Sequence, residues 1–248
     1  MKCRKNRGKK CLFWLINHLF GFFCFKDNNH DRYTISCHDE QKLKNEGKKD
    51  AKNDELIEAE YDGEKYYCTK FIERLLKDFA NEARNDYNDN YNGELIRCNQ
   101  EISDCMNNGA EIKNNAQIRI AAKSESIKKA NGNTIVISPI EADITGIYVN
   151  CTNELNKYNT NGKNKMNEVE RLIDKYSSGF NAELDFYFNK IFIYWKSFCT
   201  AYKKIHGKNE QNLKLDKEIL IKANNITNPT DEFQIKQFIE IDAFRSIS

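Results

Sequence analysis

Residues 180–202, FNAELDFYFNKIFIYWKSFCTAY, indicate where the core lies, because no other stretch of the chain's body is as apolar. Apolar side chains lie on nearly every side of a 3.6-residue period, which predicts a central helix buried all round. Lys190 and Lys196 interrupt the run, and it is too short to span a bilayer. Aromatic side chains at this density more often fill a core than line a cavity. The competing interpretation is a cavity around Trp195 that carries a lipid or another small molecule.

The segments around this stretch also favour helices. Tyr67, Phe71, Leu75 and Phe79 recur every four residues and predict an amphipathic helix over 64–84. Asn, Asp and Gly clusters separate the periodic segments and predict turns. Further helices are expected at 94–106, 110–129, 166–205 (as one helix or as two that meet near 177–179), 213–223 and 233–247, the last of which also fits a strand.

Residues 134–149 have a different character. Residues 134–137 and 147–149 are β-branched or aromatic, and Ser138-Pro139 and Thr145-Gly146 interrupt them, which predicts a small β-hairpin. An isolated hairpin is marginally stable, so it would have to pack on helices. A polar loop is expected at 152–164. The predicted fold class is therefore mainly α, a helical bundle with a small hairpin behind a membrane-targeting N-terminal segment.

That N-terminal segment, residues 1–26, joins a basic cap to an apolar run. Residues 1–10 hold six Lys or Arg and no acid, and residues 11–25 hold no Asp, Glu, Lys or Arg. A helix of this length spans about 22 Å, whereas a bilayer core needs about 20 residues. The run fits a secretory signal peptide, but small residues are poorly placed for cleavage, so an uncleaved signal anchor is a variant.

A second interpretation places the same segment on the cytosolic leaflet. Basic side chains would contact anionic lipid, aromatic rings would lie at the headgroup boundary, and S-acylated cysteines would supply a second anchoring signal. A third interpretation makes it a core helix or strand. The expected membrane-anchor residues are Lys2, Cys3, Arg4, Lys5, Arg7, Cys11, Trp14, Phe20, Phe23 and Cys24.

Charge divides the chain into three parts: the targeting segment 1–26, a charged linker 27–60 and a helical domain 61–248. Between Asp39 and Glu60, 13 of 22 residues are charged, which favours a solvated helix or disorder. The whole chain has a net charge of +2, but residues 1–26 hold seven bases and no acid, which leaves −5 for the rest. This balance argues against a nucleic-acid-binding module. The bias toward Lys, Asn and Ile is typical of an AT-rich genome.

Nine cysteines and two sequons bear on the compartment. Six cysteines follow residue 24, enough for three disulfides. Cys98 and Cys105 lie seven residues apart on one expected helix, about 10.5 Å along its axis, and cannot pair with each other. Cys68 with Cys105 is the preferred pair. Reduced thiols that pack as small apolar groups are the alternative. Asn150 and Asn225 begin sequons in expected loops and are candidate glycosylation sites.

The sequence contains no phosphate-binding loop, dinucleotide-binding glycine pattern or nucleophile elbow. No catalytic residue, cofactor or metal is therefore predicted. The leading hypothesis is a non-enzymatic binding or scaffold protein, secreted or membrane-tethered, that presents helical faces to a protein partner. One alternative is a cytosolic peripheral membrane protein held by acylated cysteines. The other is a small-molecule or lipid carrier.

Overall fold

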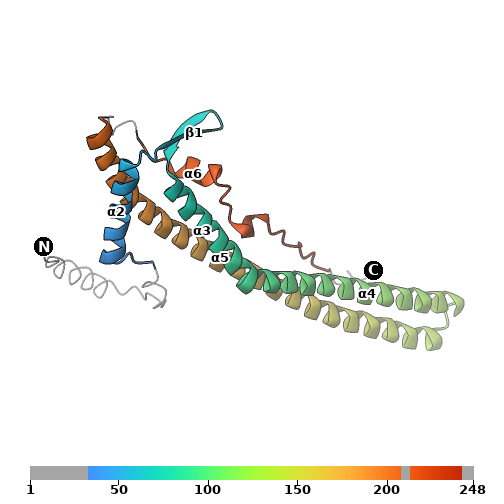
Figure 1. Ribbon diagram of the computed structural model, residues 1–248. Coiled ribbons are helices and arrows are strands. Elements are labelled where there is room, and N and C mark those ends of the chain that lie inside the picture. Colours follow the sequence, from blue (N-terminus) through green and yellow to red (C-terminus); the bar gives the residue numbers. More distant parts are fainter. Residues whose placement is uncertain (1–32, 208–212, 242–248) are drawn as a thin grey trace, which may run out of the picture.

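The computed structural model describes residues 33–207 and 213–241, which form a helical head and a long two-helix arm (Figure 1). The head comprises residues 33–87, 176–207 and 213–232, and the arm comprises residues 88–175. The elements are α2 (Cys37–Lys52), β1 (Ile57–Tyr61), β2 (Glu64–Cys68), α3 (Lys70–Tyr87), the π-helical turn η1 (Asn88–Asn92), α4 (Gly93–Lys129), α5 (Thr134–His206), α6 (Lys217–Ala223) and the 3₁₀ turn η3 (Pro229–Glu232). The chain is mostly helical with one two-stranded antiparallel sheet in the described part, which confirms the fold class in its coarse form.

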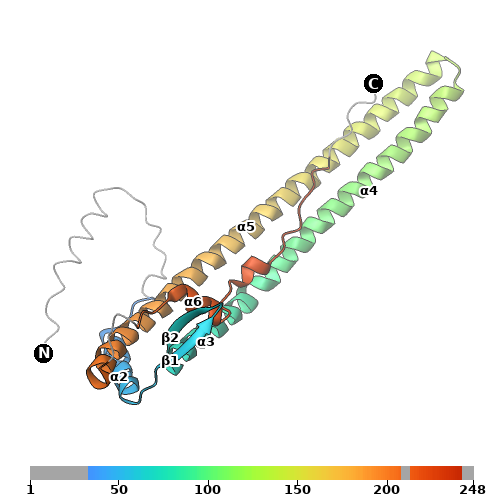
Figure 2. The ribbon, with the colours of Figure 1, turned by 90° about the horizontal axis from the view of Figure 1, so that it is seen from above.

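Helix α5 belongs to both the head and the arm. Its 73 residues span about 110 Å at 1.5 Å per residue. It begins after Asn133, whose side chain accepts a hydrogen bond from the Ile135 amide, and it ends at Gly207, whose φ of 67° is left-handed. In the arm, α5 runs antiparallel beside α4 (Figure 2).

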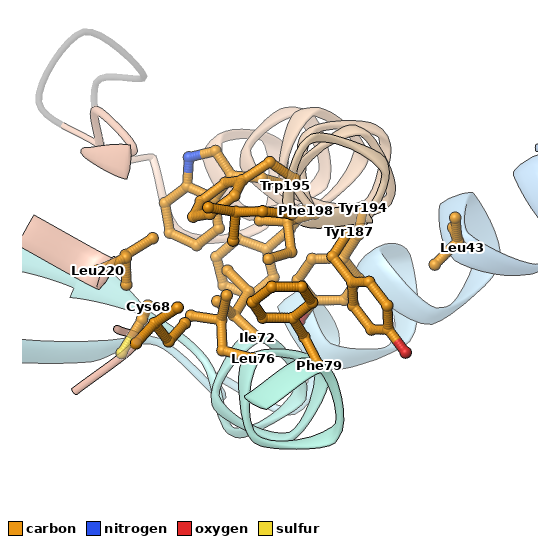
Figure 3. Close-up of a cluster of buried hydrophobic side chains, with 14 of the residues drawn as sticks. Leu43, Cys68, Ile72, Leu76, Phe79, Tyr187, Tyr194, Trp195, Phe198 and Leu220 are labelled. Atoms are coloured by element: carbon orange, nitrogen blue, oxygen red, sulfur yellow. The ribbon is translucent and has the colours of Figure 1, made fainter. Parts of the chain in front are cut away.

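The head is built around the aromatic half of α5, as the sequence predicts, but the expectation that this helix is buried all round is wrong. Phe192 is 56% exposed and lies on a stripe of exposed residues with Asn181, Asp185, Asn189, Lys196 and Thr200. Phe198 is fully buried and its ring stacks between those of Trp195 and Tyr202, with both centroid distances 5.2 Å. The Trp195 indole N–H donates to the backbone oxygen of Leu213 at 3.1 Å. Figure 3 shows α5 aromatic side chains facing apolar side chains of α3. Since these rings contact one another and not an open cavity, they serve as core.

A layer of hydrogen bonds borders this core. Three tyrosine hydroxyls on α5 donate to carboxylates of α3 and of the α2 region, so each of these three hydroxyls has an acceptor. Tyr194 gives its hydrogen to Asp50, which leaves Thr69 to donate to the Tyr194 oxygen at 2.9 Å. The donor–acceptor distances are 2.8 Å for Tyr187–Glu82, 2.7 Å for Tyr194–Asp50 and 2.5 Å for Tyr202–Asp54.

Helix α2 lies unusually close to α5. A Cβ atom at Gly47 would lie 2.6 Å from the Tyr194 carbonyl oxygen and 3.0 Å from the Phe198 nitrogen, so only glycine allows this approach. Ser197 Oγ donates to the backbone oxygen of Lys44 at 2.8 Å. The stretch 27–60, assigned to a charged linker from the sequence, thus includes a helix that packs along the head.

The hairpin expected at 134–149 is wrong, because this stretch is the first part of α5. Ile147 is buried against α4, and that packing outweighs the strand preference of β-branched residues. Pro139 is the sixth residue of the helix, where its missing N–H costs one backbone bond near the helix start. The observed hairpin pairs β1 with β2, and Asp62 and Gly63 in its turn have φ of 52° and 79°.

Four expected interruptions are also helical. Residues 85–93 pass through η1 without a turn, 107–109 lie inside α4, and 152–164 and 177–179 lie inside α5. The reason is continuous packing along the arm, which overrides local Asn and Gly preferences. The arm residues buried in this way include Leu95, Cys98, Ile102, Ala116, Ile120, Cys151, Leu155 and Val169.

The expected helix 233–247 is not helical over 233–241. These residues, here called the strap, run as an extended chain from η3 along the arm (Figures 1 and 2). Phe233, Ile235 and Phe238 pack on one apolar cluster between α4 and α5, and Ile241 packs on the next.

Candidate functional site

The membrane-anchor residues named from the sequence, from Lys2 to Cys24, lie outside the described residues. Within the described part, no helix has the length and apolar character needed to cross a bilayer. The targeting hypothesis therefore rests on the sequence alone.

The described cysteines form no disulfide. The structure does not bring Cys68 and Cys105 together, because Cys68 is buried in the head and Cys105 is half-buried on the arm. Burial raises the pKa of Cys68 to about 12, and the nearby Glu73 carboxylate adds to the rise. The Cys68 thiol therefore stays protonated at neutral pH and is a poor nucleophile. Cys37, Cys98, Cys151 and Cys199 are also free.

The two sequons differ in their setting. Asn150 is exposed but lies within α5, so the loop expected there is wrong. Asn225 is exposed just after α6, with a left-handed φ of 51°. Of the two, only Asn225 lies in the irregular backbone typical of a glycan acceptor.

A cluster of metal-ligand type lies at the base of the arm. Ligand atoms of Glu94, Cys98 and Glu168 lie within 4.8 Å of one another. Arg97 pairs with Glu94, and Lys165 pairs with Glu168 at 2.8 Å. These cations lower the pKa of both carboxyl groups, so the negative charge that a metal would need is already neutralised. The cluster is an ion-pair network across α4 and α5.

The strongest candidate for a binding surface is a groove between α2 and α5, here called the lysine groove. Its volume is about 840 Å³. Its walls are basic and its floor is largely apolar. The lining residues are Glu40, Lys44, Lys48, Lys52, Ile193, Lys196, Ser197, Thr200, Ala201, Lys204 and Ile205.

Helical spacing explains how the groove forms. Lys44, Lys48 and Lys52 lie four residues apart on α2 and therefore share one face of that helix. The α5 lining residues likewise follow each other at three- and four-residue steps. The two helices run in the same direction, since Lys44 contacts Ser197 and Ala51 contacts His206 further along. The close approach at Gly47 holds the two walls together.

The electrostatic character of the groove is strongly positive. Five lysines face one acid, Glu40, which pairs with Lys44. Lys48 and Lys196 are exposed on opposite walls. Ile205 at the floor is 47% exposed, a large value for an isoleucine next to a core. Charged walls over an apolar floor suit a ligand with acidic edges and an apolar face.

Sequence reasoning missed this groove. The lysine spacing on α2 is visible in the sequence, but the segment reads as a solvated linker because it contains few apolar residues. The groove requires α5 residues about 150 positions away, and no local pattern joins the two segments.

Comparison with protein-family models, with curated proteins and with solved structures gave no match. Functional interpretation of this chain therefore depends on the geometry of its own surfaces.

Proposed function

We propose that this chain is a non-enzymatic scaffold protein whose lysine groove holds an acidic, amphipathic helix of a protein partner. The observation that carries the proposal is the groove itself: five lysines bordering an apolar floor on the head. The long arm extends away from the head that carries this groove (Figure 1).

The shape of the groove favours a helix over a flat surface. Helix recognition by proteins commonly places the apolar side of a helix in a trough. Lys44 and Lys52 are about 12 Å apart along α2, which corresponds to about two turns of a helix. Acids four residues apart on a docked helix would repeat at the same interval as the α2 lysines. A membrane surface would not fill a concave floor in this way.

Membrane location remains part of the proposal on sequence grounds. The basic and apolar composition of residues 1–26 supports entry into the secretory pathway or an anchor on the cytosolic leaflet. Intact-mass measurement of natively expressed protein separates these locations, because cleavage near residue 25 and acylation of Cys3, Cys11 or Cys24 change the mass differently.

The groove is tested by fluorescence anisotropy with a labelled model peptide. The probe is a helical peptide with Glu at every fourth position and Leu along the adjacent face. We expect the full chain to bind it and the variant Lys48→Glu/Lys196→Glu to bind it at least about tenfold more weakly, a loss of about 1.4 kcal/mol. Raising the salt concentration should weaken binding to the unchanged protein.

The matched control is Lys129→Glu/Lys214→Glu, which makes the same change in net charge at exposed sites outside the groove. This control should retain the affinity within about twofold, an energy below about 0.5 kcal/mol. Equal loss in both variants would reduce the effect to net charge and overturn the proposal. Binding of anionic vesicles by the groove without binding of the peptide would overturn it in favour of a membrane surface.

A further inference from the structure

The arm holds the strap through two asparagine side chains that form hydrogen bonds with its backbone. Asn99 donates to the Gln234 carbonyl oxygen at 2.9 Å and accepts from the Lys236 amide at 3.0 Å. Asn159 donates to the carbonyl oxygen of Ile241 and accepts from its amide, both at 3.0 Å. A carboxamide presents one donor face and one acceptor face, as a peptide group does. These contacts therefore recognise an extended main chain whatever its side chains are.

Two glycines of the arm receive side chains of the strap. A Cβ atom at Gly162 would clash with the Phe238 ring, and a Cβ atom at Gly109 would clash with the Ile241 side chain. Each glycine therefore provides a socket that a larger residue would close. The sockets accept residues three positions apart, while Ile239 between them is 68% exposed. The two sockets therefore select an aromatic residue at one position and a branched aliphatic residue at the other.

Charge adds a third element of selection. Lys163 of α5 forms an ion pair with Glu240, which lies between the two socketed residues. Main-chain recognition, two shaped sockets and a charge pair together make a site for one pattern: aromatic, any residue, acid, branched aliphatic. We call this surface between α4 and α5 the strap groove.

We infer that the strap groove is a binding site for an extended segment of a partner protein with this pattern, and that the strap is its built-in competitor. A second copy of this chain is a poorer occupant. Its strap would make only the contacts that the tethered strap already makes, and the tether gives the latter an effective concentration in the millimolar range. A partner segment with contacts beyond the strap groove can exceed that competition.

The test uses the full chain with the strap weakened in place. In Phe238→Asp/Ile241→Asp the strap loses both socketed side chains, which frees the two sockets. The probe is a labelled peptide of residues 232–242, EFQIKQFIEID. We expect anisotropy to show at least about tenfold tighter binding to this variant than to the unchanged protein, where the strap competes. A probe with Asp at the two socketed positions should not bind.

A third substitution separates the groove from nonspecific apolar binding. Gly162→Ala, added to the weakened-strap variant, has no Phe238 ring to clash with and leaves the helix intact. It closes the aromatic socket, so the probe should lose its affinity. Should Phe238→Asp/Ile241→Asp fail to fold by circular dichroism, Ile241→Ser alone opens the distal half of the groove and is expected to admit the probe more weakly.

Three results would overturn the inference. The first is equal probe binding by the unchanged protein and by the folded variant. The second is binding that persists after Gly162→Ala. The third is a dimer of the unchanged protein, measured by light scattering at micromolar concentration, that disappears in the weakened-strap variant, because the occupant would then be the strap of a second copy.

Discussion

The head and the arm are built from the same helix, α5, yet they bury different kinds of side chain. In the head, aromatic rings from α5 meet α2, α3 and α6, and tyrosine hydroxyls reach carboxylates at the edge. In the arm, mostly small and aliphatic residues meet one antiparallel helix, and the strap covers part of the seam. A single regular helix therefore takes its stability from the side chains that its neighbours bury, which differ along its length. The head should be the more stable region, and the arm the more adaptable.

The largest expected effect is loss of an aromatic ring from the head. Phe198→Ala should lower the free energy of unfolding by about 3–5 kcal/mol, because Phe198 is fully buried and stacked on both sides. Leu155→Ala in the arm should cost less, about 2–3 kcal/mol, since two helices can close around the missing atoms. Urea denaturation followed by circular dichroism measures both. A larger cost for Leu155→Ala would reverse the comparison.

A smaller effect is expected from one added methyl group, and its sign should differ between the regions. Gly47→Ala should destabilise the head by about 1–3 kcal/mol, because the Cβ atom would press on the α5 backbone. Gly146→Ala in the arm meets no atom within 4 Å and should stabilise the protein by about 0.4–1 kcal/mol through a less flexible unfolded chain. Thermal unfolding of the two variants gives the signs. Destabilisation by both variants would show that the loss in Gly47→Ala does not come from the close approach of α2 to α5.

A loss of stability that is absent at neutral pH should appear in alkali. Burial raises the pKa of Tyr202 to about 12, and its hydrogen bond to Asp54 adds to the rise. The folded chain therefore holds this proton more tightly than the unfolded chain, whose tyrosines titrate near pH 10. The resulting stability is fully present below about pH 10 and is lost as the pH rises toward 12. Urea midpoints measured across this range should fall.

Tyr202→Phe provides the control for this titration. It removes the ionisable hydroxyl, so the decline between pH 10 and 12 should become shallower, whatever the change at neutral pH. A decline of unchanged slope would assign the alkaline loss to other groups, such as Tyr194, whose pKa burial also raises.

The sequence predicts the head better than the arm, for a physical reason. The aromatic stretch 180–202 contains most of the large apolar side chains of the chain's body, so one broad face of it forms the core of the head, and α3 carries Phe79 at the expected spacing. In the arm, Asn-rich and β-branched segments favour turns and strands locally, and only contact with the opposite helix makes them helical. The preference of residues 134–137 for a strand is overridden in this way.

The two proposed binding surfaces were likewise beyond the reach of local sequence patterns. The lysine groove and the strap groove each join segments far apart in the chain, and neither was predicted. Individual signals were present: Asp62-Gly63 is a strong hairpin signal, and the α2 lysines repeat every fourth residue. The hairpin could have been found from that dipeptide. The sockets at Gly109 and Gly162 could not, because a glycine inside a polar sequence indicates a turn until its neighbour in space is known.

One uninterrupted helix through the head and the arm also makes the molecule a lever. Helix α4, which lies wholly in the arm, is about 55 Å long. A tilt of ten degrees at the head would therefore carry the far end through about 10 Å. On the α4 side the π-helical turn η1 interrupts the regular winding at this junction, whereas α5 crosses it unbroken. If the head adjusts when the proposed partner docks in the lysine groove, small movements there would thus become large displacements at the distal tip.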